Sequence, residues 1–366
     1  MNVLITNINI AEYTGTEVYV KELAIELINR GNLVEIFTFR MGDLSQELIE
    51  KGINVTNSLK QLKLIPDIIH AHHNITALKA IKFFKFTPVV YFIHDRTSVF
   101  DHPYQHKNIL RYVAVDYNCR ERYCLENNFK EEDIEIVYNW VNTDRFRLKE
   151  QINKQPKKAL VFSNYLNDNN NIYHEIKEAC KELGVEVEII GYSSGNICLQ
   201  PEKILHNYDL VFAKAKAAIE AMATGAAVIV CDFRGLGGIV TSSNMKHFRD
   251  FNFGMKLMTN VPTKNNLIAE INKYDSCDTI KISEYIIKES DFLVVVSHLE
   301  KIYSTVIMDF KNQIRGKYHS SFSQYIFIVK STIVILTKVR LKSKLPKLYD
   351  FLKYYLKSNT RLLLIK

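Results

Sequence analysis

The segment 209–232 combines residue types and spacing that suit binding of a phosphorylated ligand. An apolar run ending at Ala213 is followed by a short turn and then by a helical pattern. Free backbone N–H groups at the start of such a helix, with Lys214 and Lys216 beside them, could bind a diphosphate. Glu220, about one turn into the helix, could accept hydrogen bonds from ribose hydroxyls. The alternative for Glu220 is a solvated charge on a core helix.

Histidines form a second group of candidates. His94 directly follows the apolar run 89–93, at the carboxyl edge where open α/β sheets bind ligands. It is either a cleft residue or a hydrogen-bonded loop histidine. His70 and His72 share one face of an expected strand, with His73 next to them, but no carboxylate or cysteine nearby completes a metal-binding set. We therefore favour structural or cleft-lining roles for these histidines and expect no bound metal.

The elements that must position these residues follow from hydrophobic periodicity. Short β-branched runs separated by helix-length segments predict buried parallel sheets. The expected strands are 3–6, 33–39, 68–71, 89–93, 112–116, 135–138, 159–163, 185–191, 210–213 and 226–232. The expected helices are 15–30, 172–183 and 217–223, and one or two more within 283–307 that close the second unit. Gly31 should stop the first helix.

The chain should form two Rossmann-like domains. Its 366 residues are roughly twice the length at which a single core stops growing. The polar stretch 151–158 suggests an interdomain linker. We expect an N-terminal, acceptor-side domain at 1–155 and a C-terminal, nucleotide-sugar-binding domain at 156–316. Gly235–Gly238 lacks the spacing of a G-x-G-x-x-G dinucleotide fingerprint, so we expect a flexible loop there rather than a site for NAD.

Charge sets the last fifty residues apart. Hydrophobic residues make up 47% of the chain and charged residues 24%, which excludes dominant disorder. From Lys311 onward there are thirteen Lys or Arg and one acid, Asp350, although the whole chain carries only +8. A mildly acidic body with a basic tail does not suit nucleic-acid binding. For 317–366, and 318–366 in particular, we favour a basic amphipathic helix on an anionic membrane over ordinary helices with solvated faces or true insertion.

Cysteine usage and the start of the chain predict the compartment. The six cysteines include no C-x-x-C pair, so buried reduced thiols are favoured over a zinc site. The first residues look like a strand and not like a signal peptide. We expect a cytoplasmic protein that can bind peripherally to the inner face of the cell membrane.

A resemblance to a known family strengthens these expectations. The run E-A-M-A-T-G-A-A-V-I, which starts at Glu220, resembles the E-A-M-A-x-G-x-P-V-V signature of the retaining GT-B glycosyltransferases. Three more segments resemble that family in the same order: 15–34, P-D-I-I-H-A-H at 66–72 and V-Y-N-W-V-N-T-D-R-F at 137–146. The resemblance spans about residues 1–310. It implies a group 1, family 4-like glycosyltransferase with an α/β GT-B fold, two Rossmann-like domains and a cleft between them.

The resemblance also implies an activity and a site. The expected enzyme is a hexosyltransferase-like, retaining transferase that moves a sugar from a nucleoside-diphosphate sugar to a hydroxyl. His94 and Glu220 are the catalytic candidates, and the matching glutamate of the family holds the donor ribose. The donor-binding candidates are Gly15, Thr16, Lys214, Lys216 and Glu220. The nucleotide sugar is a substrate, so no cofactor is expected. The acceptor would be a saccharide or lipid-linked saccharide of bacterial envelope polysaccharide biosynthesis, and no nucleic acid would bind.

Two departures from the family pattern qualify this expectation. The first glutamate of the family's pair would fall at position 212, which is Phe212, and the stretch Ser163–Asn171 lacks the basic residues that usually hold the diphosphate. Either Lys214 and Lys216 supply the charge or the protein is inactive. A non-catalytic GT-B protein that binds a nucleotide or a partner is thus the main alternative. A sugar-nucleotide epimerase is weaker, because no acidic pair suits proton abstraction. The phosphate site requires that the helix starting near Lys216 faces the cleft, and that the two amines are not both held in unrelated ion pairs.

Overall fold

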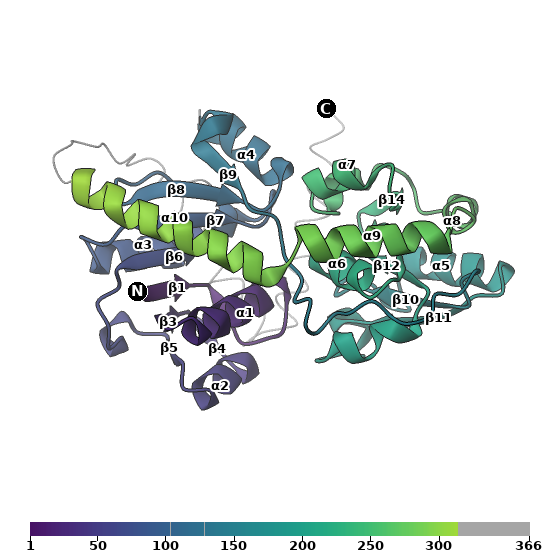
Figure 1. Ribbon diagram of the computed structural model, residues 1–366, viewed down its shortest axis with the longest axis horizontal. Helices are drawn as coiled ribbons and strands as arrows, with labels where there is room; N and C mark the ends of the chain where they lie inside the picture. Colours follow the sequence, from purple (N-terminus) through teal and green to yellow (C-terminus); the bar gives the residue numbers. More distant parts are fainter. Residues whose placement is uncertain (103, 128, 314–366) are drawn as a thin grey trace, which may run out of the picture.

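The computed structural model describes residues 1–102, 104–127 and 129–313, which form two lobes (Figure 1). The first lobe contains a seven-stranded parallel sheet in the order β5-β3-β1-β6-β7-β8-β9. Its strands are β1 (Asn2–Thr6), β3 (Leu33–Phe37), β5 (Asn54–Thr56), β6 (Ile68–His72), β7 (Val89–Ile93), β8 (Ile109–Ala114) and β9 (Ile134–Ile136). The strand order reverses between β1 and β6, and such a switch point is where doubly wound sheets bind ligands.

Helices cover both faces of this sheet. They are α1 (Gly15–Asn29), α2 (Asp43–Glu50), α3 (Asn74–Phe83) and α4 (Tyr117–Asn127), and a short parallel pair, β2 (Asn9–Ile10) with β4 (Arg40–Met41), lies beside them. Helices α1 and α2 pack on one face, and α3 and α4 pack on the other. All five residues of β7 are fully buried, which is why the strand reads as a continuous apolar run. Gly31, at φ 82°, follows the end of α1 as predicted.

The second lobe contains a five-stranded sheet in the order β11-β10-β12-β13-β14. Its strands are β10 (Lys158–Phe162), β11 (Glu186–Ile190), β12 (Leu210–Ala213), β13 (Ala227–Asp232) and β14 (Gly235–Ile239), and its helices are α5 (Asn171–Glu182), α6 (Ala215–Ala223), α7 (Met245–Asp250), α8 (Lys264–Ile271) and α9 (Ser276–Glu289). The flexible loop expected at Gly235–Gly238 is wrong, because these residues form β14, antiparallel to β13. Glycine suits this edge because Gly235 and Gly238 have positive φ, and a Cβ at Gly237 would lie 3.2 Å from the Cβ of Val230.

The chain crosses between the lobes twice, and the two crossings lie side by side. Trp140 belongs to the core of the first lobe and Val141 to that of the second, so the first crossing precedes the polar stretch 151–158. The second crossing follows α9, where the N–H of Val141 donates to the carbonyl of Ser290 and the N–H of Phe292 donates back to Val141. Paired crossings of this kind form a narrow connection about which the lobes can move.

Helix α10 (Phe292–Gln313) returns to the first lobe, over which it runs in Figure 1. Val296, Leu299, Tyr303 and Val306 are part of the first lobe's core. The order of elements along the sequence predicts that this helix closes the C-terminal domain. Its apolar spacing of three and four residues predicts a buried face, but it does not say which lobe will bury that face.

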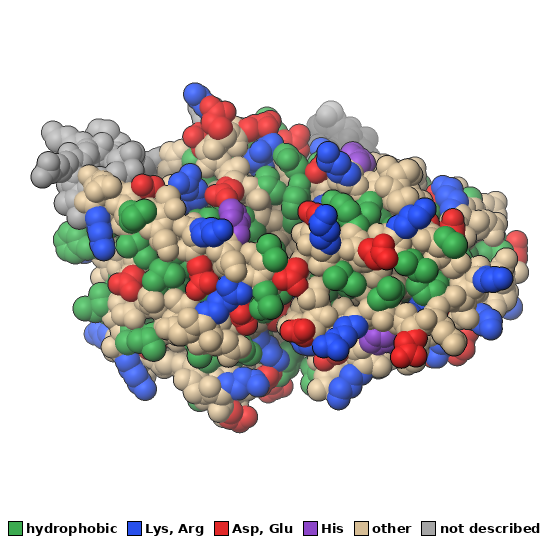
Figure 2. All heavy atoms as spheres, viewed as in Figure 1, with side chains coloured by type: hydrophobic (Ala, Val, Ile, Leu, Met, Phe, Trp, Pro, Cys, Tyr) green, Lys and Arg blue, Asp and Glu red, His purple; other side chains and the backbone are tan. Residues whose placement is uncertain are grey.

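Several expectations concern surfaces rather than the core. Residues 317–366, the expected basic tail, lie outside the described residues. Within the described part, no helix is long and apolar enough to span a membrane. On the face shown in Figure 2, basic and acidic side chains are interspersed rather than gathered by sign. Cys119, Cys180 and Cys231 are buried as expected, but Cys277 is exposed.

Candidate active site

A cleft of about 490 Å³ lies between the lobes, at the carboxyl ends of β7, β10, β12 and β13. The first lobe contributes Gly15, Thr16, Tyr19, His94, Asp95 and Asp116 to its lining, and the second contributes Ser163, Asn164, Tyr165, Lys214, Lys216, Asp232 and Asn252. A smaller pocket of about 160 Å³ is lined by Glu22, Arg145, Ile197, Leu199, Lys216 and Glu220. Five of the six candidates named from the sequence thus line the larger cleft, and Glu220 lines the smaller pocket.

The amino end of α6 faces both spaces, as the phosphate prediction requires. Ala215 starts the helix with φ 49°, a left-handed conformation that is unusual for a residue with a side chain. Its N–H donates to the carbonyl of Phe253 at 3.0 Å. The N–H groups of Lys216 and Ala217 have no acceptor among the described residues, and both residues line the cleft and the smaller pocket. This helix end can therefore bind an anion.

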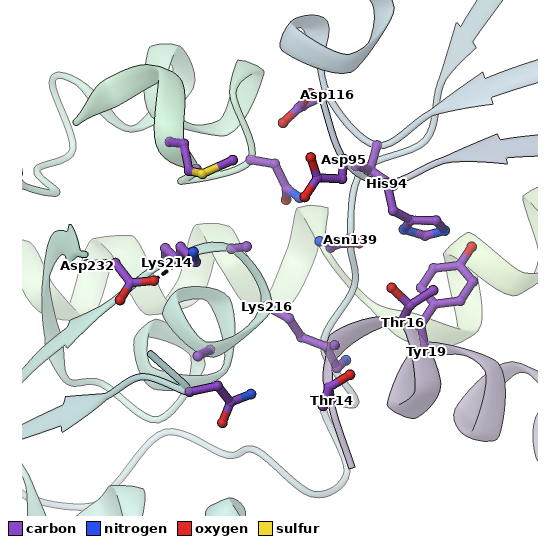
Figure 3. A pocket seen from close by; sticks show the side chains of 18 of the residues that line it. Thr14, Thr16, Tyr19, His94, Asp95, Asp116, Asn139, Lys214, Lys216 and Asp232 are labelled. Carbon is purple, nitrogen blue, oxygen red and sulfur yellow. Dashed lines mark ion pairs between the residues drawn. The ribbon is translucent and has the colours of Figure 1, made fainter. Parts of the chain in front are cut away.

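Lys214 lies on the wall of the larger cleft. Its Nζ is 2.6 Å from Oδ2 of the buried Asp232, which also accepts a hydrogen bond from the hydroxyl of Ser163 (Figure 3). The ammonium also lies 4.4 Å from the ring centre of Tyr165 and 4.8 Å from that of Phe233. The side chain keeps 21% of its surface exposed. Asp232 thus holds the lysine in place while leaving it accessible from the cleft.

Lys216 connects the two lobes. Its Nζ is 2.9 Å from Oε2 of Glu22 on α1 and 3.5 Å from Oε1 of Glu220, and it donates to the carbonyl of Trp140 at 3.3 Å. Burial lowers the pKa of Lys216, but the two carboxylates outweigh burial and raise it overall. A buried ammonium needs such partners. The ammonium is already paired with Glu22 and lies beside Glu220, so Lys216 is less available to a phosphate than the sequence suggests, and its phosphate role stays a prediction.

Glu220 is the carboxyl group in this cluster that titrates nearest neutrality. Burial raises its pKa to about 7, against the attraction of Lys216 and with an added contribution from the charge of Glu22. Glu22 behaves in the opposite way: burial raises its pKa, but Lys216, Trp140 and Arg145 outweigh burial and lower it. Glu22 is therefore the ionised partner of Lys216, and Glu220 gains or loses a proton near pH 7. The ribose role of Glu220 stays a prediction.

His94 lies at the end of β7 on the opposite wall of the cleft, next to the ring of Tyr19 (Figure 3). Its backbone N–H donates to Oδ1 of Asp101 at 3.1 Å, and its Nε2 is 2.8 Å from Nδ1 of His72. Burial, with a further contribution from His73, lowers the pKa of His94 to about 3. The imidazole is therefore neutral at physiological pH. Its contact with the transferred sugar stays a prediction.

Gly15 and Thr16 approach the cleft from the first lobe. They begin α1 directly after Thr14, whose hydroxyl donates to the carboxylate of Glu17. Burial raises the pKa of Glu17, although bonds from Thr14, its own backbone and Asn9 pull it down. Gly15 and Thr16 line the same cleft as the first residues of α6, and their contact with the donor phosphates stays a prediction.

The two departures from the family pattern have clear structural positions. Phe212 is fully buried in β12, packed with the apolar side chains between the sheet and helices α5 and α8, so no carboxylate reaches the cleft from that position. The loop that starts at Ser163 does line the cleft, through Ser163, Asn164 and Tyr165, but it carries no cation there. Lys214, which contacts the Tyr165 ring, is the cation nearest this loop in the described part of the cleft.

Sequence reasoning missed several lining residues. Asp232 could have been recognised because it ends a buried strand at the sheet's carboxyl edge. Asn252 gave no physical signal in the sequence, and only the structure marks it: it and Phe253 have φ near 50°, and its buried Oδ1 has no hydrogen-bond partner among the described residues. Nothing in the sequence marked Glu22 as a site residue, because it resembles any other charged residue of a helix.

Comparison with known proteins gives a family match over part of the chain and a fold for both lobes. Residues 13–145 match the family described as Glycosyltransferase Family 4. Similar solved structures include Anabaena Alr3699/HepE in complex with UDP and glucose, which is 14% identical with a TM-score of 0.60 over 82% of this chain and 99% of that one. A glycosyltransferase from Rickettsia africae ESF-5 is 14% identical, with a TM-score of 0.54 over 84% and 98% of the two chains. WaaG, a glycosyltransferase involved in lipopolysaccharide biosynthesis, is 13% identical, with a TM-score of 0.50 over 83% and 99%.

This chain has the GT-B fold. The expected fold class, with two Rossmann-like domains and a cleft between them, is confirmed. The resemblance to group 1 glycosyltransferases is confirmed as well. No curated protein matches the chain by sequence. At identities near 14%, the GT-B neighbours establish the fold alone, because proteins that share a fold can have different activities.

Proposed function

We propose that this chain is a retaining glycosyltransferase that moves a hexose-like sugar from a nucleoside-diphosphate sugar to a hydroxyl acceptor. One arrangement carries this proposal: the amino end of α6, with Lys214, opens into the interlobe cleft opposite His94. The helix end offers positive charge and N–H donors where a diphosphate would leave. The structure of HepE in complex with UDP-glucose supports a nucleotide sugar as the class of donor.

Different parts of the donor would occupy the larger cleft and the smaller pocket. The smaller pocket would take the nucleoside, with Glu220 accepting hydrogen bonds from the ribose and the apolar side chains of Ile197 and Leu199 along the base. The diphosphate would lie across the N–H groups of Lys216 and Ala217. The sugar would then reach into the larger cleft, toward the wall that His94 and Tyr19 line. The acceptor would enter from the side of the first lobe.

In this reaction, the main task of the protein is to stabilise the leaving group. The bond between the anomeric carbon and the diphosphate oxygen breaks, and negative charge grows on that oxygen. Lys214 and the N–H groups at the start of α6 would meet this charge, and donors of this kind commonly contribute 10²–10³ in rate. The acceptor hydroxyl forms the new bond at the anomeric carbon and passes its proton to the departing diphosphate oxygen, so the step balances. Retention rests on the resemblance to the family.

The acceptor and the location belong to the same proposal. We assign the chain to bacterial envelope polysaccharide synthesis, with a lipid-linked saccharide as acceptor and a cytoplasmic position at the membrane's inner face. The charge of residues 318–366 supports this, because a basic segment is attracted to anionic lipids. Deleting 318–366 should abolish flotation with anionic liposomes, and unchanged binding would refute the membrane role of that segment.

A non-catalytic GT-B binding protein is the second candidate. Phe212, the cation-free loop at Ser163 and the carboxylate partners of both lysines favour it. Thermal-shift screening with UDP-, GDP- and ADP-sugars should reveal the donor as a rise in Tm, since a ligand that binds only the folded state stabilises it. The enzymatic function is supported if the protein turns over that donor and if Glu220→Ala and Lys214→Ala/Lys216→Ala lose this activity. The surface control Lys51→Ala should keep it. Binding without turnover supports the alternative.

A further inference from the structure

A continuous chain of side-chain hydrogen bonds runs from helix α10 through the first lobe to the cleft. The hydroxyl of Tyr303 on α10 is 2.5 Å from Nδ1 of His70 on β6. Nε2 of His70 is 2.8 Å from Nε2 of His72 on the same strand. Nδ1 of His72 is in turn 2.8 Å from Nε2 of His94 at the end of β7. Only His94, the last member, lines the cleft.

The first three members are sealed from solvent. Tyr303, His70 and His72 have no exposed surface, and the ring of Phe92 stacks on His70 at 3.9 Å. Burial lowers the pKa of His70 and His72 well below the usual value, with smaller contributions from the neighbouring imidazoles. All three imidazoles are therefore neutral, and each carries one ring N–H and one acceptor nitrogen.

Counting protons leaves two possible directions for this chain of hydrogen bonds. Three contacts need one proton each, and the four groups carry four protons in total. If every bond points toward the cleft, Tyr303 donates to His70, His70 to His72, and His72 to Nε2 of His94. The proton of His94 then lies on Nδ1, which has no partner among the described residues.

The reverse direction leaves a buried donor without an acceptor. In that case His94 would donate to His72, and Nδ1 of His70 would donate to the oxygen of Tyr303. The hydroxyl proton of Tyr303 would then need another acceptor, and none lies within hydrogen-bond distance in the described part of the chain. A buried donor without an acceptor costs more free energy of folding than an average hydrogen bond contributes. The direction toward the cleft is therefore favoured.

We propose that Tyr303, His70 and His72 are positioning residues that fix His94 as the Nδ1–H tautomer, so that it donates a hydrogen bond to an oxygen of the bound donor, on the transferred sugar or its phosphate. This inference rests on the proposed function for the identity of the ligand, but not for the tautomer. His94 then acts as a neutral donor and not as a base. Tyr303 lies on α10, the helix that crosses back from the second lobe. This helix therefore also sets which ring nitrogen of His94 carries the proton.

The tautomer can be measured directly on the full chain. Long-range ¹H–¹⁵N spectra of the ¹⁵N-histidine-labelled protein, with the His94 signals assigned by their loss in His94→Asn, should show Nδ1 protonated and Nε2 unprotonated. Tyr303→Phe removes the directing hydroxyl, so the Nδ1–H fraction should fall to about half and kcat by about twofold. The control is Tyr112→Phe, which removes another buried tyrosine hydroxyl of the same lobe, bonded to the carbonyl of Tyr104, and should change neither. A protonated Nε2 in the wild type would overturn the proposal.

Two amide variants of His94 test the donor function. Asparagine places an N–H near the position of Nδ1, whereas glutamine places its amide near Nε2, toward His72. We expect kcat/KM with the nucleotide sugar to fall roughly 100-fold in His94→Gln but no more than about tenfold in His94→Asn. Weaker binding of the free nucleoside diphosphate in His94→Gln would locate the acceptor on the phosphate, and a loss confined to the sugar nucleotide would locate it on the sugar. Equal activity of the two variants would refute the donor role. Failure of the wild type to turn over any donor would refute the proposed function but leave the tautomer measurement valid.

Discussion

Donor binding should weaken as the pH falls below neutrality, because the ionised carboxylate of Glu220 accepts hydrogen bonds from ribose hydroxyls more strongly than the neutral acid does. Burial raises the pKa of Glu220 to about 7. If only the ionised form binds, the apparent Kd rises by the factor 1 + 10^(pKa − pH), which is about 11 at pH 6 and about 1.1 at pH 8. We therefore expect binding about tenfold weaker at pH 6 than at pH 8, a difference of about 1.4 kcal/mol.

The same pKa shift affects stability with the opposite sign. The ordinary pKa is 4.5, so the folded protein holds this proton more tightly than the unfolded chain does. The contribution of Glu220 to the free energy of unfolding should therefore decline as the pH rises from about 4.5 to about 7. Affinity for the donor and this contribution to stability thus change in opposite directions with pH.

Isothermal titration calorimetry with the nucleotide sugar at pH 6, 7 and 8, at constant ionic strength, measures the binding effect. The diphosphate of a nucleotide sugar is a diester and does not titrate in this range. Glu220→Gln should give weak binding with no dependence on pH. Glu22→Gln should move the midpoint to lower pH, because the charge of Glu22 helps to raise the pKa of Glu220. The matched control Glu26→Gln, on the same helix but paired with Arg30, should behave like the wild type.

Two results would refute this reasoning. A flat profile in the wild type would mean that Glu220 does not titrate near pH 7 or does not contact the donor. An unchanged slope in Glu220→Gln would assign the titration to another group. Asp101 is the group to examine in that case, because burial also raises its pKa to about 7 and it bonds to the backbone of His94.

Three further predictions concern the second lobe. Lys214→Ala should lower kcat/KM for the donor roughly 100-fold, because it removes the cation beside the amino end of α6; a loss below about threefold in single-turnover kinetics would contradict this. Ala215→Gly should raise the free energy of unfolding by about 1 kcal/mol in urea titrations, because glycine adopts φ 49° without strain, and an unchanged midpoint would argue against it. Phe212→Glu should destabilise the fold by about 4 kcal/mol or more instead of restoring the family's carboxylate, because Phe212 is fully buried; a variant with wild-type melting would disprove this.

The sequence by itself determined most of the secondary structure around the site. The buried run 89–93 reads as a strand because both of its faces are apolar, and the structure forms β7 over those residues. Gly31 marks the end of α1 because the backbone there needs a positive φ. The pattern around Glu220 predicted a helix whose amino end faces a ligand, and α6 begins at Ala215 beside the cleft. These features depend on local periodicity and backbone geometry, which neighbouring residues specify.

Only the tertiary structure decided which partners the charged and titrating groups have. Lys216 pairs with Glu22, 194 positions away, and Tyr303 directs His70 across 233 positions. Helix α10 packs on the first lobe although it follows the second in sequence. A periodic apolar face in the sequence indicates only that another apolar surface must cover it. A lone charge indicates only that a polar or oppositely charged partner is needed. Which partner it finds depends on how distant segments pack, and that packing is what raises the pKa of Glu220 and keeps His94 neutral.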